Sequence, residues 1–123
     1  MLSFVHFEIP ADDIERASKF YNMLFGWRAE KVSGPCEYWM MNTKKTPEEC
    51  GINGGISRRK NSAEHIVNYV EVDSMDNYIK KVEQLGGKVI EPKTPISKMG
   101  WYAVCLDTEN NTFGIWQTDA NAK

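Results

Sequence analysis

Two histidines stand at matching places in this chain of 123 residues. His6 and His65 each open a segment with a strand-like pattern, and each is followed 49 residues later by a glycine, Gly55 or Gly114. Histidine is a common metal ligand, and its side chain changes charge near neutral pH. His6 and His65 are therefore the first candidates for a metal site.

Carboxylates that could complete such a site lie on the same segments. A catalytic Zn²⁺, Ni²⁺ or Fe²⁺ centre normally uses three protein ligands and keeps a position open. By strand alternation Glu8 and Glu71 face the same side as the histidines, so either could supply a third ligand or act as a catalytic acid–base group. The alternative is that His6 is a hydrogen-bonded cavity residue and His65 an exposed start of a strand.

Glycines and aromatic residues on the expected strands predict a cavity for an organic ligand. A glycine inside a strand marks close approach by a ligand or by another backbone, and Gly55 and Gly114 would widen such a cavity. Trp116 points the same way as Gly114 by strand parity. The remaining candidates for the aromatic wall are Trp39, Tyr69 and Trp101. The alternative is that these aromatic side chains form the core or a dimer interface.

The segments that must position these residues repeat one order in each half: a strand, a capped helix, a glycine and further strands. In the first half Asp12 and Glu15 form a capping-box pattern, and in the second a helix is expected to begin at Asp73-Ser74. Strands are expected at 3–9, 27–32, 37–42 and 51–57, and again at 66–72, 88–91, 101–106 and 112–117.

An order that returns at a fixed offset indicates an internal duplication. The length allows one compact domain but not two independent cores. We therefore predict an α+β fold of paired βαβββ modules, residues 1–58 and 65–123 joined by a linker at 59–64, whose two curved mixed sheets enclose a cavity. Sheets of this kind leave open edges, so we also expect a homodimer.

The composition excludes several other classes of protein. A net charge of −2 argues against nucleic acid as a partner, because phosphate binding needs a clustered positive surface. No apolar run approaches the length that would span a membrane. The three cysteines, Cys36, Cys50 and Cys105, support neither a disulfide framework nor a metal clip, so we expect reduced thiols in a cytoplasmic protein.

A series of short sequence motifs follows in order along nearly the whole chain. In the first half they are His6 to Pro10, Asp13, Arg16-Ala17, Phe20-Tyr21 and Phe25-Gly26-Trp27, and in the second Val72-Asp73, Leu85-Gly86-Gly87 and Asp107 to Gln117.

Together these motifs resemble the vicinal oxygen chelate superfamily, which includes glyoxalase I, extradiol dioxygenases and bleomycin-resistance proteins. The last motif is similar to a DPxGNxFGLWQ-type ending, with Thr108 and Asn110 in place of its proline and glycine. The resemblance implies the paired-module fold. It also implies that metal-dependent members take one ligand from the first and last strand of each half, typically a His or Gln and a Glu.

Carried onto this chain, the resemblance places His6 at the first ligand position and His65 at the third, each to within two residues. The fourth position falls on Gly114 and the second on or beside Gly55, so both acidic ligands are missing. The resemblance therefore implies no standard metal cofactor. The alternative is a divalent Zn, Ni, Fe or Mn ion held by His6, His65 and a relocated carboxylate.

Three functions follow from these observations. The first is a metal-independent protein of the glyoxalase and bleomycin-resistance type that binds a small organic molecule in an aromatic cavity. The second is a metal-dependent lyase, isomerase or dioxygenase that uses His6 and His65 with Glu8 or Glu71. The third is a degenerate domain that acts in protein assembly.

Overall fold

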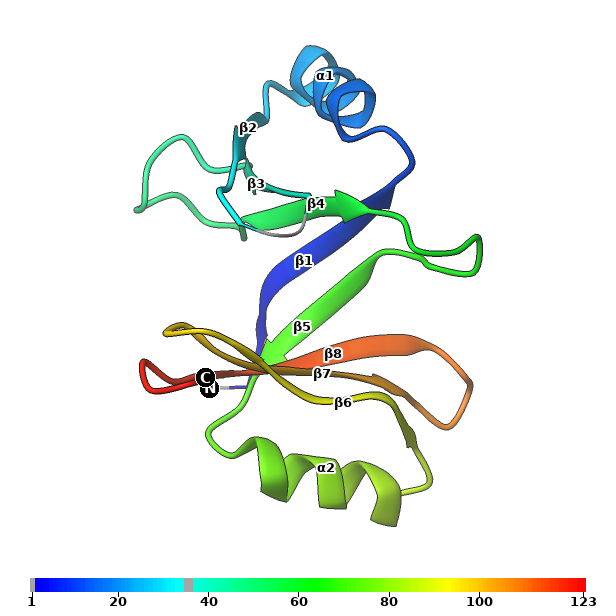
Figure 1. The fold of residues 1–123 in the computed structure, drawn as a ribbon. Coiled ribbons are helices and arrows are strands. Elements are labelled where there is room, and N and C mark those ends of the chain that lie inside the picture. Colours follow the sequence, from blue (N-terminus) through cyan, green and yellow to red (C-terminus); the bar gives the residue numbers. More distant parts are fainter. Residues whose placement is uncertain (1, 35–36) are drawn as a thin grey trace. The chain divides into compact units, whose positions relative to one another are not determined.

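The computed structural model of the chain describes residues 2–34 and 37–123, and it has an α+β fold. Figure 1 shows its order of elements, two modules of strand, helix and three strands. The first module contains β1 (Phe4–Ala11), α1 (Ile14–Phe25), β2 (Arg28–Lys31), β3 (Tyr38–Asn42) and β4 (Gly54–Arg58). The second contains β5 (Val67–Glu71), α2 (Met75–Gln84), β6 (Lys88–Ile96), β7 (Gly100–Leu106) and β8 (Thr112–Thr118).

The chain forms two compact units. The first unit is His6–Ile66, and the second combines the residues up to Val5 with Val67–Lys123. In the part of the chain that the structure describes, neither helix is long and apolar enough to cross a membrane.

In the first unit the sheet has the order β2-β3-β4-β1, with β1 parallel to β4 and the other pairs antiparallel. The connecting residues at 59–64 fold back onto this unit, because the Arg59 backbone N–H donates to the Ala11 carbonyl at 2.8 Å. Its core is formed by one face of the sheet and the inner side of α1. The buried members are Phe7, Ile9, Ala11, Ile14, Met41 and Ile56.

Local sequence explains where α1 begins and ends. Asp13 is the N-cap, and its carboxylate accepts a hydrogen bond from the Arg16 N–H at 3.0 Å. The N-cap is thus Asp13 and not Asp12, and Arg16 rather than Glu15 stands three residues after it. Gly26 ends the helix in the left-handed conformation, with φ of 77°, and donates to the Asn22 carbonyl at 2.8 Å.

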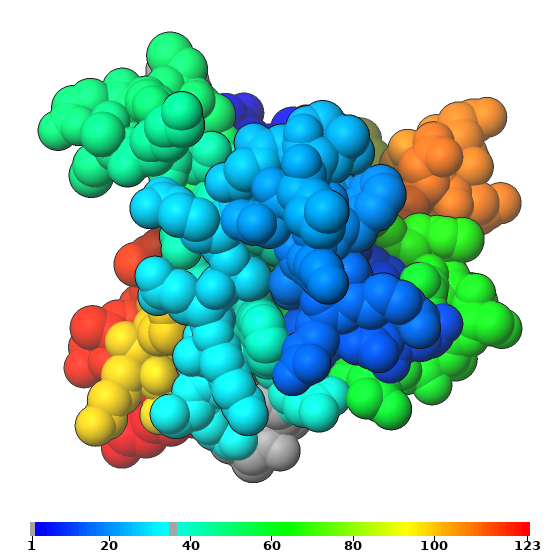
Figure 2. Space-filling model, turned by 90° about the horizontal axis from the view of Figure 1, so that it is seen from above, coloured from blue at the N-terminus to red at the C-terminus, as the bar shows by residue number. Residues whose placement is uncertain are grey.

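The outer side of α1 stays exposed and apolar. Figure 2 shows this helix, in the lighter blues, on the surface of the molecule. Large apolar side chains on it are more than half exposed: Phe20, Met23, Leu24 and Phe25. The helix therefore buries only its inner stripe within the unit.

In the second unit the sheet has the order β5-β8-β7-β6, again with a parallel first pair. Of the two residues expected to start α2, Ser74 is the N-cap, and the Met75 N–H donates to the Gln117 side-chain oxygen at 2.7 Å. β6 runs on to Ile96, beyond the expected end at residue 91, because β7 pairs with its whole length. Its prolines are tolerated since β6 is paired on one side only within this unit. The core consists of Val72, Met75, Ala103, Cys105 and Ile115.

The strand register confirms the duplication and also corrects its frame. Glu8 pairs with Gly55 across β1 and β4, and Tyr69 pairs with Gly114 across β5 and β8. If the two glycines are equivalent, Tyr69 is the counterpart of Glu8, and Val67 is the counterpart of His6. His65 lies two residues earlier, before β5 begins, and is exposed. The equal 49-residue spacing therefore does not mark equivalent positions, although each histidine was placed only to within two residues.

Candidate functional site

His6 is the centre of a polar cluster on the face of the first unit's sheet that points away from α1. Its Nε2 atom lies 3.2 Å from Glu8 Oε1 and 3.2 Å from the Tyr38 hydroxyl oxygen. One nitrogen thus faces two oxygens and can serve them in two ways. With a proton on Nε2 it donates to the carboxylate, and without one it accepts from the phenol. The cluster can therefore hold a shared proton in more than one arrangement.

Strand alternation explains why these side chains meet. His6 and Glu8 are two residues apart on β1, whereas Phe7 and Ile9 between and after them point into the core. Tyr38 reaches the cluster from β3, across the intervening strand β4. Sequence reasoning did not find Tyr38. The parity of the strand expected at 37–42 shows only that Tyr38 and Trp39 face opposite sides, not which of them shares a face with His6.

Gly55 explains how Tyr38 crosses β4. A Cβ atom at Gly55 would overlap the hydroxyl group and the adjoining ring carbon of Tyr38, so this phenol occupies the space of the absent side chain. Gly55 was expected to widen a cavity by lacking a side chain. Instead, the space beside it is filled by Tyr38.

The carboxylate of Glu8 is only partly satisfied. Its Oε1 atom faces His6, whereas Oε2 is buried and has no hydrogen-bond partner among the residues that the structure describes. A buried acceptor without a donor costs free energy, on the order of 1–3 kcal/mol for a neutral group and more for a charged one. A ligand that donates a hydrogen bond to the cluster would therefore gain the most binding free energy at this oxygen.

The second unit has tyrosine and glycine at the corresponding place but no histidine. A Cβ atom at Gly114 would overlap the ring of Tyr69, which is 9% exposed. Tyr69 and Tyr102 pack edge to face, with ring centroids 6.4 Å apart. Both predicted acidic-ligand positions are thus glycines covered by a tyrosine ring.

Glu71 belongs to a separate hydrogen-bonded row at the end of this face. The Trp116 indole N–H donates to Thr118 Oγ1 at 3.0 Å, and that hydroxyl donates to Glu71 Oε2 at 2.8 Å. Trp116 lies opposite Glu71 and shares its face with Tyr69 and Gly114. The predicted orientation of Trp116 follows from this register.

The other two tryptophans predicted to line the cavity, Trp39 and Trp101, lie on the opposite, helix-facing sides of their sheets. Trp39 packs against the first core and Trp101 against the second. Trp101 also donates its indole N–H to Asp119 Oδ2 at 3.0 Å, and this bond is the main cause that lowers the pKa of Asp119. Trp39 does not share a face with Gly55, nor Trp101 with Gly114, because each tryptophan is the strand neighbour of a tyrosine that does, Tyr38 or Tyr102.

The described residues do not bring together the three donors that a catalytic metal ion would need. Among residues 2–34 and 37–123, no three His, Cys, Asp or Glu side chains converge as a metal would require. His6 and Glu8 supply two donors, and the space of a third at Gly55 is taken by the Tyr38 phenol. Cys36, the predicted reduced thiol nearest to Tyr38 in sequence, lies outside the described residues. The donor set therefore falls short of a catalytic centre.

Known proteins share both sequence and fold with this chain. Residues 3–43 match the family model described as bleomycin resistance protein-like N-terminal. A glyoxylase-like domain-containing protein of Didymella fabae is 30% identical over 115 residues, which cover 88% of each chain. The anthracycline biosynthesis protein DnrV of Streptomyces peucetius is 27% identical over 125 residues, 90% of this chain but 45% of that protein. This chain thus spans about half the length of DnrV.

Similarity to a solved structure extends over both modules. Methylmalonyl-CoA epimerase from Mycobacterium tuberculosis has a TM-score of 0.69 to this chain at 9% identity, with 94% of this chain and 87% of that chain covered. The duplicated fold defines a protein of paired βαβββ modules. The chain belongs to the vicinal oxygen chelate superfamily, among its glyoxalase-like and bleomycin-resistance-like proteins.

Proposed function

We propose that this protein binds a small organic molecule without a metal centre, through the polar cluster of His6, Glu8 and Tyr38. The observation that carries the proposal is the position of Tyr38, whose phenol fills the space of a side chain at Gly55 and reaches His6. A carboxylate at Gly55 would have been the natural third metal donor. A phenol there favours hydrogen bonding to an organic ligand instead.

The polar atoms of the cluster suggest which groups the ligand presents. Glu8 Oε2 is a buried acceptor without a donor, so the ligand should carry an O–H or N–H group that reaches it. Met40 is half buried and two residues from Tyr38 on the same strand face, so it offers apolar surface beside the cluster. A small apolar molecule with one well-placed hydroxyl or amine is the class that this surface supports.

The second unit supports the aromatic part of the proposal by itself. Tyr69, Tyr102 and Trp116 share one face of its sheet around Gly114. Aromatic rings offer a large apolar area with polar atoms at one edge, which suits flat organic ligands. We therefore retain Tyr69 and Trp116 as proposed ligand contacts. We leave out Trp39 and Trp101, and also Gly114, because the Tyr69 ring covers it.

The first experiment is metal titration of the tag-free protein with Ni²⁺, Zn²⁺, Fe²⁺ and Mn²⁺. We expect no stoichiometric binding at micromolar protein. His65→Ala serves as the matched control for His6→Ala, since His65 is exposed and lies outside the cluster. Stoichiometric binding that is lost in His6→Ala and kept in His65→Ala would overturn the proposal.

The second experiment tests the donor group directly, with phenol and its methyl ether anisole as probes. Phenol can donate to Glu8 Oε2, whereas anisole has the same ring and no donor. We expect phenol, but not anisole, to shift the NMR signals of His6 and Tyr38, and Glu8→Gln to weaken phenol binding by about tenfold. Equal binding of both probes would contradict a role for Glu8 Oε2.

One observation favours the metal-dependent lyase, isomerase or dioxygenase as the second candidate. His6 Nε2 and Glu8 Oε1 are 3.2 Å apart, so both could contact one ion, and Glu8 Oε2 has no competing donor. Metal bound in the first experiment would favour this function, and screening of substrates with vicinal oxygens would follow. If neither metal nor organic probes bind, the assembly domain is the remaining candidate.

The homodimer stays a prediction, and a monomer in light scattering at micromolar concentration would contradict it.

A further inference from the structure

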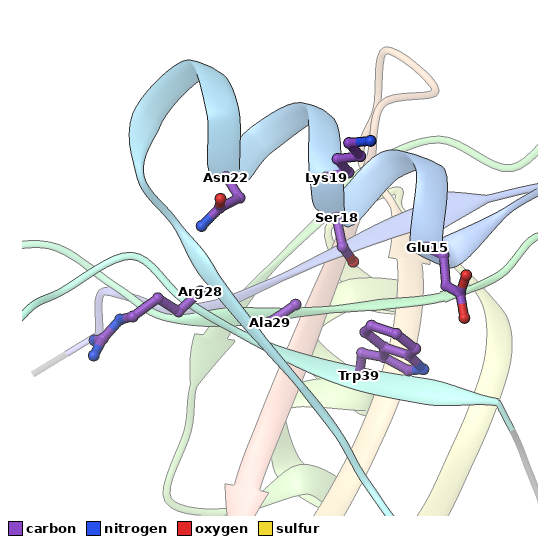
Figure 3. Close-up of a pocket in the computed structure, with 7 residues that line it drawn as sticks. All are labelled: Glu15, Ser18, Lys19, Asn22, Arg28, Ala29 and Trp39. Atoms are coloured by element: carbon purple, nitrogen blue, oxygen red, sulfur yellow. The ribbon is translucent and has the colours of Figure 1, made fainter.

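A hollow lies in the first unit, between α1 and the strands β2 and β3. Its volume is about 380 Å³, and it opens to solvent. Figure 3 shows the side chains around it, four from the helix and three from the strands. They are Glu15, Ser18, Lys19, Asn22, Arg28, Ala29 and Trp39. Because Trp39 packs on the side of the sheet that faces α1, this hollow is distinct from the cluster around His6.

Ser18 is the residue that marks this hollow as a binding site. It is 7% exposed, yet within residues 2–34 and 37–123 its hydroxyl group has no hydrogen-bond partner. In Figure 3 this hydroxyl points down from α1 into the space above Ala29 and beside Trp39. A buried hydroxyl without a partner is destabilising, and buried polar groups in native proteins are nearly always paired. A ligand in the hollow would supply the missing partner.

The helix presents a polar stripe to the hollow. Glu15, Ser18, Lys19 and Asn22 follow the spacing of residues on one side of a helix, and all carry hydrogen-bonding groups. Together with Arg28 they include one negative and two positive charges. The Arg28 guanidinium already donates to the Lys44 carbonyl at 2.8 Å. The lining therefore offers hydrogen-bond donors and acceptors together with charges of both signs. This mixture suits a neutral ligand better than a strongly charged one.

Trp39 supplies the apolar surface on the other side. Its indole is half buried, and the small side chain of Ala29 on the neighbouring strand leaves room beside it. We propose that the hollow binds a neutral polyol of monosaccharide size. Its C–H groups pack on the indole of Trp39, and its hydroxyl groups, each both donor and acceptor, pair with Ser18 and the polar stripe.

The test is an NMR titration of the isotope-labelled protein with D-glucose, D-galactose and D-mannose, and with sodium benzoate as an anionic planar probe. We expect at least one sugar to shift the Trp39 indole N–H and the amides of Ser18 and Asn22 at millimolar concentration. The Trp101 indole is the internal control, because it lies in the second unit and should not move. Benzoate should cause no shift at the same concentration.

The variants separate a bound ligand from a nonspecific effect. Ser18→Ala keeps the helix and should weaken sugar binding by about fivefold, the loss of one net hydrogen bond. Arg16→Met, at an exposed position of α1 outside the lining, should leave the affinity for a neutral sugar within twofold, and added salt should not change that affinity. The proposal is overturned if no sugar shifts these signals, if benzoate alone does, or if Ser18→Ala binds sugar as tightly as the wild type.

Discussion

The phenol of Tyr38 occupies the space into which a side chain at Gly55 would extend, and its hydroxyl lies 3.2 Å from His6 Nε2. The second unit repeats the relationship with Tyr69 over Gly114. In each module a glycine and a tyrosine together stand where the superfamily resemblance implied an acidic ligand. On this substitution we base the proposal that the face binds its ligand through hydrogen bonds rather than through a metal ion.

Gly55→Ala should destabilise the protein, because the new Cβ would overlap the Tyr38 hydroxyl and displace the ring. We expect the free energy of unfolding to fall by about 1–3 kcal/mol, as for other overpacked sites. The measurement is urea-induced unfolding followed by circular dichroism.

Tyr38→Ala provides the control for this effect. In the double variant Gly55→Ala with Tyr38→Ala the overlap is gone, so the cost of the alanine at residue 55 should largely disappear. Equal costs with and without the tyrosine would show that Tyr38 does not fill the space beside Gly55.

Ser18→Ala should stabilise the ligand-free protein. The change removes a buried hydroxyl that has no partner and places a better helix former within α1. We expect the free energy of unfolding, measured by urea-induced unfolding, to rise by about 1 kcal/mol. A decrease of similar size would mean that the hydroxyl makes a stabilising bond in solution.

Cys105 should resist alkylation, whereas Cys50 should react. Burial, and to a smaller extent the nearby charge of Glu83, raises the pKa of the Cys105 thiol to about 11. Cys50 is exposed. At pH 8 the thiolate fraction of Cys105 is then roughly 100-fold below that of an ordinary cysteine. Site-resolved mass spectrometry after iodoacetamide treatment measures both rates, and comparable rates would contradict the burial of Cys105.

Asp119 should make stability depend on acid pH. Hydrogen bonds from the Trp101 indole and the Asn121 backbone hold the pKa of this carboxyl below its usual value. Because its pKa is lower in the folded than in the unfolded state, Asp119 stabilises the fold at pH values above about 4, its pKa in the unfolded state. This stabilisation is lost as the pH falls through the pKa of the folded state.

Asp119→Asn keeps an acceptor for Trp101 and removes the charge. The variant should therefore be less stable than the wild type at neutral pH, and the difference should shrink as both are unfolded at progressively lower pH. A difference that does not change with pH would show that the charge of Asp119 has no part in it.

The sequence predicted only part of the candidate site. The alternation on β1 predicted that His6 and Glu8 share a face, since the side-chain period of a strand is set locally. Tyr38 could not be predicted, because it reaches His6 across β4. The pattern of β3 alone does not show which of its two faces lies on the same side of the sheet as His6. Ser18 had a signal, because it lies one turn after the buried Ile14 on a helix whose inner side is otherwise apolar.

By itself the sequence determined the duplicated order of strand, helix and strands, and the helix starts near Asp13 and at Ser74. These features depend on period and capping within a few residues, so they are written locally. Only the tertiary structure decided the register of β5 against β8. That register makes Val67 rather than His65 the counterpart of His6, and it depends on hydrogen bonds between residues far apart in the chain. It likewise decided that tyrosine rings fill the space at Gly55 and Gly114, because packing joins side chains that no local pattern relates.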